Sequence, residues 1–321
     1  MLRIRACEDL DECRRLWQNN WPVNCVFDLW SVRDCFQEQY NNQPYFLVAE
    51  RHGDIYGLLA LSWIEEEQCY GHFPGEIWQG KTWLEQNKIM ARNSEVFRAL
   101  LGHIPGEANI RYLTRDSISM NHESMSIDEM GYLFFPGQYS YSYQIYMQRF
   151  SGKSRKKLDR ELTGLKGSGL SFRHDRLADV DLMFKMNTDA FGERSYFNDT
   201  RFMKAFENLL AWLCKKGLLH VSTVLLGGKA AAVDVAAVWG SSCTVLAGGT
   251  HPEFPGVAKL INFHHIEWAC LKRLSQVDFL CGDFGWKKRF HLTPRPLYQI
   301  LMPFESEIPQ DFHAEKRTAC A

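Results

Sequence analysis

The clearest candidates for chemistry lie in "TVLAGGTHPEFPGVAKLINFHH", where an apolar segment ends in glycines and a helical segment begins. The first turn of a helix presents unpaired backbone N–H groups and the positive end of the helix dipole, so it attracts phosphate or carboxylate. Gly256 has no Cβ and would let the backbone approach such a group, while Lys259 would add positive charge. The alternative is a plain strand-to-helix loop. The predicted anion-binding residues are Gly248, Gly249, Gly256, Val257, Ala258, Lys259 and Leu260.

Two carboxylates and one lysine are candidates for proton transfer or charge stabilisation. Asp234 interrupts "AAAVDVAAVW", a pattern that predicts a buried strand, and a buried carboxylate needs a partner or a place at a cleft. In that position, Asp234 would be a carboxylate of raised pKa that accepts a proton, or it would form a salt bridge or a cap to a neighbouring strand. In "CGDFGWKKRF", Asp283 would orient an amine or form a turn. Lys287 would stabilise an oxyanion, or be a solvated surface residue.

Histidine and cysteine spacing predicts no metal site and no disulfide framework. His264 falls on the apolar stripe of the predicted helix 257–274, which favours a packed core histidine, and His265 is expected at the surface. Adjacent helical residues diverge by about 100°, so this pair is not expected to share one ion. The 10 cysteines lack any C-x-x-C spacing, which favours free thiols. Cys243 and Cys281 flank the candidate site, and small buried strand residues are favoured over a nucleophile.

The elements that would position these residues occur twice along the chain. Apolar, β-branched segments flank glycine turns at residues 52–54 and 227–229, which predicts two hairpins. Helical patterns precede each hairpin, over residues 10–17 and 32–40 in the first half and 177–191 and 201–216 in the second. Further helices, over 94–104 and 257–274, precede the strands "ANIRYLTRD" and "QVDFLCGDFG". The repeated order predicts two related α/β domains.

The segment between the halves combines an alternating pattern with a basic helix. "YSYSYQIYMQRF" alternates like a strand, and residues 153–166 are predicted to be helical. Residues 151–176 hold eight Lys or Arg and three Asp or Glu, a local balance of +5. This charge would form either a solvated surface helix or an electropositive lip facing an anionic ligand.

Three of these motifs resemble those of the BioF2-like/CelD-like acetyltransferases, a GNAT superfamily branch related to Fem-type aminoacyl transferases. They are "SGKSRKKLDRELTGLKGSG", "VLAGGTHPEFPGVAKLINFHHIEWA" and "FLCGDFGWKKRF". The resemblance implies an α/β (α+β) fold of two tandem GNAT-like domains, each a mixed, largely antiparallel sheet flanked by helices. We expect a degenerate acceptor-side domain over residues 1–150, an acyl-CoA-binding domain over 151–305 and a polar tail over 306–321. Substrate contacts are expected from Trp78, Trp83, Glu85, Asn87 and Trp286.

The function that this resemblance implies is direct N-acyl transfer, with acetyl preferred, from acyl-CoA to an amine of a small molecule, sugar or peptide. The alternatives are aminoacyl transfer from tRNA and a non-catalytic module that binds a nucleotide or a partner. The net charge of −1 gives no case for DNA and disfavours tRNA. No apolar run is long enough for a membrane span, and the charged N-terminus does not resemble a signal peptide, so we expect a cytoplasmic protein without a metal cofactor.

Overall fold

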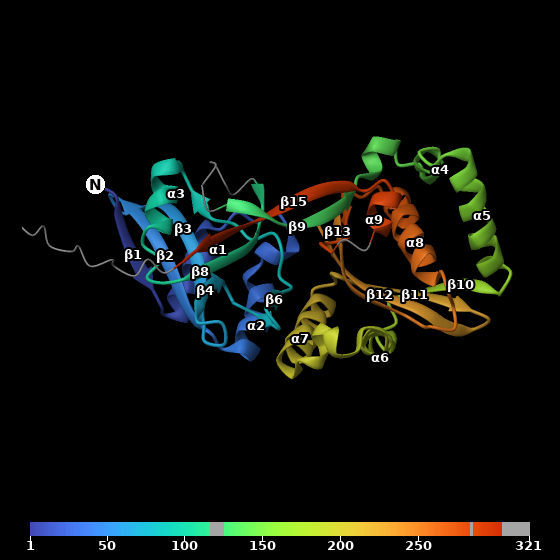
Figure 1. Cartoon of the computed structure of the whole chain (residues 1–321), viewed down its shortest axis with the longest axis horizontal. Coiled ribbons are helices and arrows are strands. Elements are labelled where there is room, and N and C mark those ends of the chain that lie inside the picture. The colour runs from blue at the N-terminus through green and yellow to red at the C-terminus, as the bar shows by residue number, and fades with distance from the viewer. Residues whose placement is uncertain (116–124, 283–284, 304–321) are drawn as a thin grey trace, which may run out of the picture.

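The computed structural model describes residues 1–115, 125–282 and 285–303, and it shows two halves side by side with one sheet running through both (Figure 1). The sheet has 13 strands in the order β1-β2-β3-β4-β8-β15-β9-β14-β13-β12-β11-β10, with β7 paired to β3. Its strands are β1 (Arg3–Cys7), β2 (Gln43–Arg51), β3 (Asp54–Ile64), β4 (Cys69–His72), β7 (Met90–Ala91), β8 (Ala108–Leu113), β9 (Met125–Phe134), β10 (Leu170–His174), β11 (Leu219–Leu226), β12 (Lys229–Trp239), β13 (Ser242–Thr250), β14 (Gln276–Asp278) and β15 (Thr293–Met302). A separate ribbon pairs β5 (Ile77–Trp78) with β6 (Lys81–Thr82).

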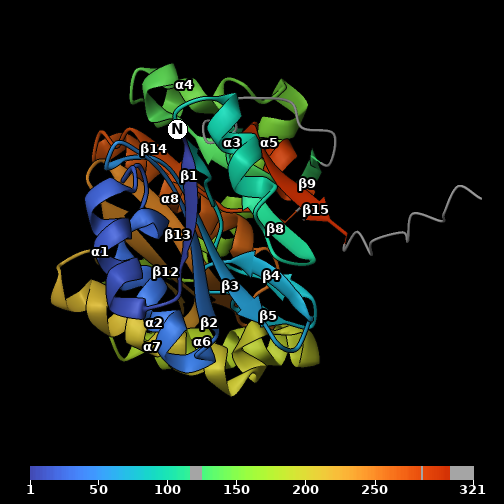
Figure 2. The ribbon, with the colours of Figure 1, turned by 90° about the vertical axis from the view of Figure 1, so that its left-hand side faces the viewer.

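Helices cover both faces of this sheet. They are α1 (Leu10–Asn20), α2 (Trp30–Tyr40), α3 (Ser94–Leu101), α4 (Tyr143–Met147), α5 (Gly152–Lys166), α6 (Asp179–Phe191), α7 (Thr200–Lys215), α8 (Val257–Leu271) and α9 (Trp286–Arg289). In the first half, α1 and α2 lie on one side of the strands and α3 on the other (Figure 2). The predicted mixed, largely antiparallel sheet flanked by helices is confirmed. None of the helices in the described part of the chain combines the length and apolar composition that crossing a membrane requires.

Both predicted hairpins are confirmed, and their turns follow from local chemistry. His52 and Gly53 have φ of 55° and 88° between β2 and β3, and Gly227 and Gly228 have φ of 57° and 80° between β11 and β12. Two-residue hairpin turns favour this left-handed region because its twist matches that of the flanking strands. Around these hairpins, the order strand–helix–helix–three strands–helix–strand runs from β10 to β14, and it also runs from β1 to β8 with the two-residue strands β5, β6 and β7 inserted before α3.

The last strand of each half completes the sheet of the other half. β4 pairs in parallel with β8, which then pairs antiparallel with the C-terminal strand β15. In the second half, β13 pairs in parallel with β14, which pairs antiparallel with β9 from the first half. β9 and β15 also pair with each other, from Leu133↔Thr293 to Met125↔Ile300. The domain boundary at residue 150 remains a prediction. The pairing of β9 with β15 joins the two halves across that boundary.

The strand predicted within residues 139–150 is wrong, because this segment is helical. A 3₁₀ turn over Pro136–Tyr139 is followed by α4. The rings of Tyr139, Tyr143 and Phe150 all lie within 6.1 Å of the fully buried Tyr146 ring, centroid to centroid. Tyr143 and Tyr146 lie three residues apart on α4, whereas Tyr139 contacts Tyr146 from the 3₁₀ turn and Phe150 does so from the turn after the helix. This packing outweighs the alternation of serine and tyrosine.

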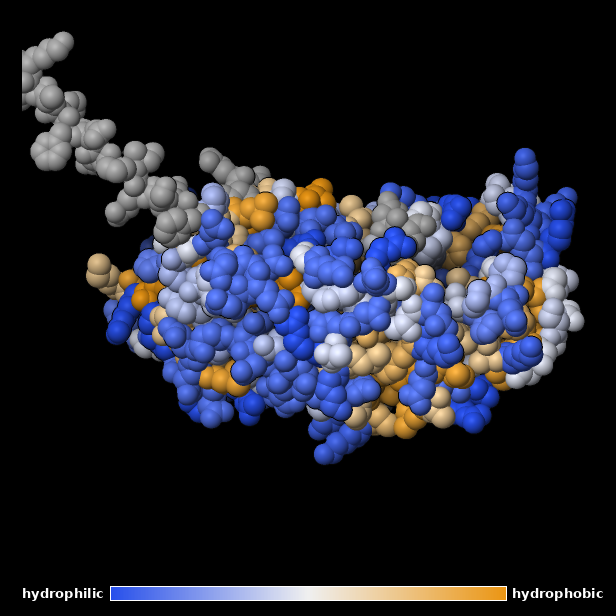
Figure 3. Space-filling view, turned by 60° about the horizontal axis from the view of Figure 1, so that its bottom comes forward, coloured by the Kyte–Doolittle hydropathy of each residue, from blue (hydrophilic) through white to orange (hydrophobic). Residues whose placement is uncertain are grey.

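Adjacent glycines on β13 show which helices cover which face of the second half. A Cβ on Gly248 would point at Asp234, which contacts α8, whereas a Cβ on Gly249 would meet Met183 and Met186 of α6. Neighbouring strand residues point to opposite faces, so α8 and α6 lie on opposite sides of the sheet. On and beside α6, Leu177, Leu182 and Phe191 are exposed, and Figure 3 shows hydrophobic residues gathered on the underside of the second half. This hydrophobic area lies on the side of the sheet opposite to α8.

Candidate functional site

Helix α8 begins at a glycine with open space around it. Gly256 is the N-cap, with φ of 89°, and a Cβ placed on it would meet no atom within 4 Å. The N–H of Val257 donates to Phe254 O (3.2 Å) and that of Lys259 donates to Gly256 O (3.0 Å). The N–H of Ala258 has no hydrogen-bond partner among the described residues. Two of the amides that we predicted to be free are therefore used inside the loop, and the Ala258 amide is the one available to an anion.

Lys259 connects the start of α8 to the basic helix α5. Its Nζ forms an ion pair with Glu161 of α5, and this hydrogen bond lowers the pKa of the Glu161 carboxyl. Exposed basic residues of α5 are Lys153, Lys156, Lys157 and Arg160. The fold thus brings the predicted electropositive segment beside the start of α8, although the charge of Lys259 itself is compensated by Glu161.

Gly248 and Gly249 allow close packing on the two faces of β13. A Cβ on Gly248 would lie 2.1 Å from Asp234 Oδ1 on the neighbouring strand, a distance that no real structure tolerates. A Cβ on Gly249 would lie 2.7 Å from Met183 O and from Met186 Cβ of α6. These contacts give both glycines a structural reason, and a role for them in cofactor binding stays a prediction.

Gly248→Ala is expected to lower the free energy of unfolding by about 1–3 kcal/mol, because the added methyl group must displace the Asp234 carboxylate. Urea unfolding measures this loss. Gly164→Ala on α5 is the matched control, because a Cβ there meets nothing within 4 Å and should not destabilise the helix. Equal stability of the two variants would show that the Asp234 side chain moves aside freely.

Asp234 and His265 form a buried pair across β12 and α8. Asp234 Oδ2 lies 2.9 Å from His265 Nε2, and the two residues are 7% and 1% exposed. The prediction of a surface position for His265 is wrong, because the carboxylate in the apolar strand needs a partner and α8 supplies it. His265 Nδ1 is buried and makes no hydrogen bond. The isolated Asp234 was the sequence signal that could have identified a buried partner on α8.

A column of five stacked rings extends from β10 across α8 and β11. Successive ring centroids lie 4.0 Å apart for Phe172–His264, 5.1 Å for His264–His174, 5.5 Å for His174–His220 and 4.4 Å for His220–Trp268. Burial, followed by the charge of neighbouring histidines, lowers the pKa of His264 to about 3. Rings stacked face to face do not aim their lone pairs at one point. No group of three or more potential ligands in the described chain could hold a metal ion.

His264→Phe is expected to make the protein less sensitive to acid while preserving the stack. The pKa of His264 is depressed in the folded protein, so its stabilising contribution is complete above about pH 6.5 and is lost as pH falls toward 3. Between about pH 7.5 and 5.5, the native protein should lose about 1 kcal/mol more unfolding free energy than the variant. Urea titrations at both pH values test this, with the exposed His103→Gln as control. Identical losses in native protein and His264→Phe would contradict the prediction.

Lys287 is buried and holds the chain segment that follows β14. Its Nζ donates to Phe279 O (2.8 Å), Leu280 O (2.9 Å) and Cys281 O (2.6 Å), and burial lowers its pKa. The alternative of a solvated surface lysine is therefore wrong. Trp286 packs edge to face against Phe279, with ring centroids 5.7 Å apart. Asp283 lies outside the described residues.

The thiols near this segment are poorly suited to nucleophilic chemistry. Burial raises the pKa of Cys243 to about 12, and burial together with the Glu85 carboxylate raises that of Cys281. Both cysteines therefore remain protonated near neutral pH. Cys243 is the buried strand residue that the sequence predicts, whereas Cys281 is only partly buried and follows β14, so that part of the prediction is wrong.

Glu85 from the first half lies against the segment that follows β14. The Cys281 N–H donates to Glu85 Oε1 (2.6 Å), whereas Oε2 makes no hydrogen bond and lies 3.7 Å from Arg295 Nη2. Glu85 is 2% exposed, and burial followed by the charge of Asp278 raises its pKa to about 7. Asp278 is itself held by Gln86 Nε2 (3.0 Å) and Arg295 Nη1 (2.8 Å). Glu85 is thus a buried carboxyl with one oxygen fixed by the Cys281 N–H, and the other makes an ion pair with Arg295 but no hydrogen bond.

This carboxyl lies beside the point where two parallel strands separate. β13 and β14 pair at three positions, of which Thr244↔Asp278 is the last. Beyond it, Phe279 and Leu280 bond to Tyr132 of β9, while β13 continues alongside β12. Buried polar atoms without hydrogen bonds gather here, since Tyr132 OH is one of them together with Glu85 Oε2 and Arg295 Nε. Such atoms are usual where a water or a substrate group binds.

The other residues predicted to contact substrate pack between the two halves. The Trp83 ring lies 5.4–5.8 Å from the rings of Phe27, Phe36, Phe202 and Phe206, which come from both halves. Trp78 contacts Tyr196 at 5.8 Å. Asn87 Nδ2 donates to Arg111 O (2.8 Å), and its buried Oδ1 has no partner. Their role in substrate binding stays a prediction, and Glu85 and Asn87 each have a buried oxygen that makes no hydrogen bond.

Comparison with known proteins identifies the second half. Residues 152–288 match the family model described as "Acetyltransferase (GNAT) domain". This segment runs from α5 into α9 and includes the start of α8 and Lys287. Residues 152–288 therefore match a GNAT acyltransferase domain, and the resemblance to the GNAT superfamily predicted from the motifs is confirmed. No curated protein matches the sequence.

Solved structures share the fold of nearly the whole chain. FemX superposes with a TM-score of 0.58 at 10% identity, over 93% of this chain and 97% of FemX. A conserved protein of unknown function from Bacteroides thetaiotaomicron gives 0.57 at 10% identity, over 93% and 99%. L-PGS from Bacillus licheniformis gives 0.52 at 9% identity, over 86% and 92%. At these identities, the likeness establishes a common fold.

Proposed function

We propose that this chain is an N-acyltransferase that moves an acyl group, most simply acetyl, from acyl-CoA to an amine of a small molecule, sugar or peptide. The observation that carries the proposal is the start of α8 within the GNAT-matching segment. There the open space at Gly256 and the unpartnered N–H of Ala258 suit the pyrophosphate of CoA. The exposed basic residues of α5 add favourable charge on the same side.

The transfer is a direct displacement at the thioester carbonyl. The acceptor nitrogen forms a C–N bond, the C–S bond breaks, and CoA leaves as the thiolate while the attacking amine loses a proton. Glu85 is our candidate for taking that proton, because its pKa of about 7 suits a general base near neutral pH and its Oε2, although paired with Arg295, makes no hydrogen bond. Asp234, which is already bonded to His265, is the second candidate. Lys287 keeps the Cys281 backbone in place, and that backbone in turn fixes Glu85 Oε1.

Calorimetry with acetyl-CoA and free CoA tests the donor site. The native chain should bind both at micromolar concentration, and Gly256→Trp should weaken binding by about 100-fold because the indole would fill the space at the helix start. Gly240→Trp is the matched control, since Gly240 is also a left-handed glycine with nothing within 4 Å of an added Cβ, and it lies in the turn between β12 and β13, at the other end of β13 from Gly256. Failure of folded native protein to bind either ligand would exclude acyl-CoA as donor.

Aminoacyl-tRNA is the alternative donor, and one observation favours it. Lys153, Lys156, Lys157 and Arg160 are all exposed on α5, and the fold is shared with FemX. Aminoacyl-tRNA binding that weakens steeply with salt, and further with Lys156→Gln and Lys157→Gln, would support this donor. Donor binding without product over a screen of amines would instead indicate a non-catalytic module.

A further inference from the structure

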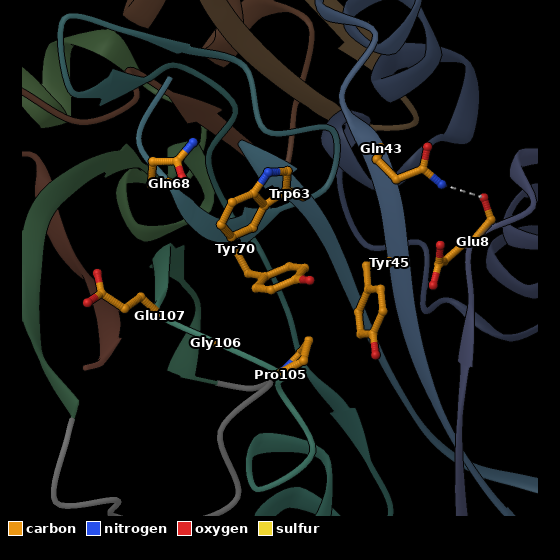
Figure 4. Close-up of a pocket in the computed structure, with 9 residues that line it drawn as sticks. All are labelled: Glu8, Gln43, Tyr45, Trp63, Gln68, Tyr70, Pro105, Gly106 and Glu107. Carbon is orange, nitrogen blue, oxygen red and sulfur yellow. Dashed lines mark hydrogen bonds between the residues drawn. The ribbon is translucent and has the colours of Figure 1, made fainter. Parts of the chain in front are cut away.

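A second candidate site lies in the first half, away from every residue of the proposed reaction. It is a cavity of about 620 Å³ between strands β2, β3 and β4 and the segment that leads into β8 (Figure 4). None of its lining residues belongs to the second half of the chain. An inference about this cavity is therefore independent of the proposed acyl transfer.

Three aromatic rings form the floor of the cavity. The Tyr70 ring lies between the other two, 5.2 Å from Tyr45 and 5.0 Å from Trp63 between centroids, at interplanar angles of 51° and 61°. All three side chains are partly exposed. Because the rings are tilted against each other, they present a concave set of π faces and edges rather than one flat platform.

Hydrogen bonds hold the indole N–H of Trp63 and the side-chain amides of Gln43 and Gln68 around these rings. Glu65 accepts from Trp63 Nε1 (2.8 Å) and from Gln68 Nε2 (3.0 Å), which holds both side chains in place. Gln43 Nε2 donates to the Glu8 carbonyl oxygen (3.3 Å). The cavity therefore offers a ligand π faces, carboxylate oxygens and the hydroxyl groups of Tyr45 and Tyr70.

The charge of the lining is entirely negative. Glu8 and Glu107 are exposed, and they lie on opposite sides of the aromatic rings in Figure 4. Among the residues that the structure describes, no Lys, Arg or His lines the cavity. Anions such as the phosphates of CoA are repelled by this lining, whereas a cation is attracted both by the carboxylates and by the π faces.

We propose that this cavity binds an organic ammonium group, either a quaternary ammonium or the ammonium of a lysine side chain. The cation would lie over the Tyr70 and Trp63 faces, with Glu8 and Glu107 compensating its charge. The preformed positions of Trp63 and Gln68 reduce the conformational entropy lost on binding. A neutral sugar would use the rings and donate hydroxyl hydrogen bonds to the two carboxylates, but it would leave their negative charge uncompensated.

NMR titration of the full-length protein tests this, with the Trp63 indole N–H signal identified by Trp63→Phe. Choline should shift that signal with a Kd of about 1–10 mM, and its neutral isostere 3,3-dimethylbutan-1-ol should bind about tenfold more weakly. Nα-acetyl-lysine methylamide distinguishes a quaternary ammonium from a lysine side chain as the ligand, since binding of this probe that is stronger than binding of choline would identify a lysine side chain. The pair Glu8→Gln and Glu107→Gln should weaken choline binding by about tenfold, whereas Glu253→Gln in the second half should have no effect.

Tyr70→Leu removes the central ring and should also weaken choline binding, whereas Tyr70→Phe keeps the ring and should retain it. The carboxylate variants lie on the surface and keep the test valid if Tyr70→Leu fails to fold. Equal affinity for choline and its neutral isostere would overturn the proposal in favour of a plain apolar groove. Binding of a chitin oligosaccharide in place of choline would overturn it in favour of a sugar site. An unshifted Trp63 signal at about 50 mM of either cation would overturn it outright.

Discussion

Glu85→Gln is expected to lower kcat/KM for amine acylation by about 10²–10⁴-fold, because the amide cannot accept the proton of the attacking amine. The pKa of Glu85 is raised to about 7, so the native kcat/KM should increase as pH rises through that value and the carboxyl ionises. The variant should lose this part of the pH profile. Steady-state rates between about pH 6 and 9 with a fixed amine measure both effects.

Stability measurements separate this chemical effect from damage to the fold. A carboxyl whose pKa is raised in the folded state stabilises the protein below its unfolded pKa and loses that contribution as pH rises through the folded value. Above about pH 7, Glu85→Gln should therefore be at least as stable as the native protein.

Glu76→Gln is the matched control for Glu85→Gln, because Glu76 is equally buried but its Oε1 accepts from the Leu84 N–H (2.7 Å) and the Trp83 N–H (3.1 Å). It should lose stability and keep the pH profile of the rate. Full activity of Glu85→Gln would show that another group accepts the proton, and the pair of Asp234 and His265 would then be the first to examine.

Lys287→Met is expected to lower the free energy of unfolding by about 2–4 kcal/mol, because Phe279 O and Cys281 O lose this donor and Leu280 O keeps only the Tyr132 N–H. Activity should fall as well, since the released Cys281 backbone no longer fixes Glu85 Oε1. Urea unfolding and steady-state rates on the same samples measure both. The exposed neighbour Lys288→Met is the control and should change stability by less than about 0.5 kcal/mol.

The two roles considered for Lys287 give different results in that experiment. A positioning role predicts that loss of stability and loss of kcat occur together. A Lys287→Met protein that is as stable as the native one but inactive would contradict the positioning role and favour direct stabilisation of the oxyanion, as predicted from the sequence.

Several elements of this fold could be predicted from the sequence because their causes are local. The turns at Gly53 and Gly228 require left-handed backbone conformations, and the flanking apolar alternation has the period of a strand. The helices that begin at Ser94, Thr200 and Val257 follow apolar spacings of three and four residues. The start of α8 at Gly256 was visible for the same reason, since proline and glycine there interrupt two periodic segments.

The tertiary structure alone decided how the candidate site is assembled. β9 and β15 carry weak alternation and, in β15, two prolines, so their exchange between the halves depends on pairing partners more than 100 residues away in the sequence. That exchange places Arg295 against Asp278 and Glu85. The pKa of Glu85 then follows from burial and from a charge that is distant in the sequence.

His265 and Lys287 show the same limit at the level of single residues. Each is a polar residue that local patterns place at the surface, and each is buried because a distant group needs it. Asp234 needs a hydrogen-bond partner, which His265 supplies. The carbonyl oxygens after β14 need a hydrogen-bond donor, which Lys287 supplies. The sequence by itself determined the elements and the polar residues that demand partners. The identity of those partners was decided by the packing of α8 and the separation of β13 from β14, because hydrogen-bond satisfaction in a buried site is a property of the whole fold.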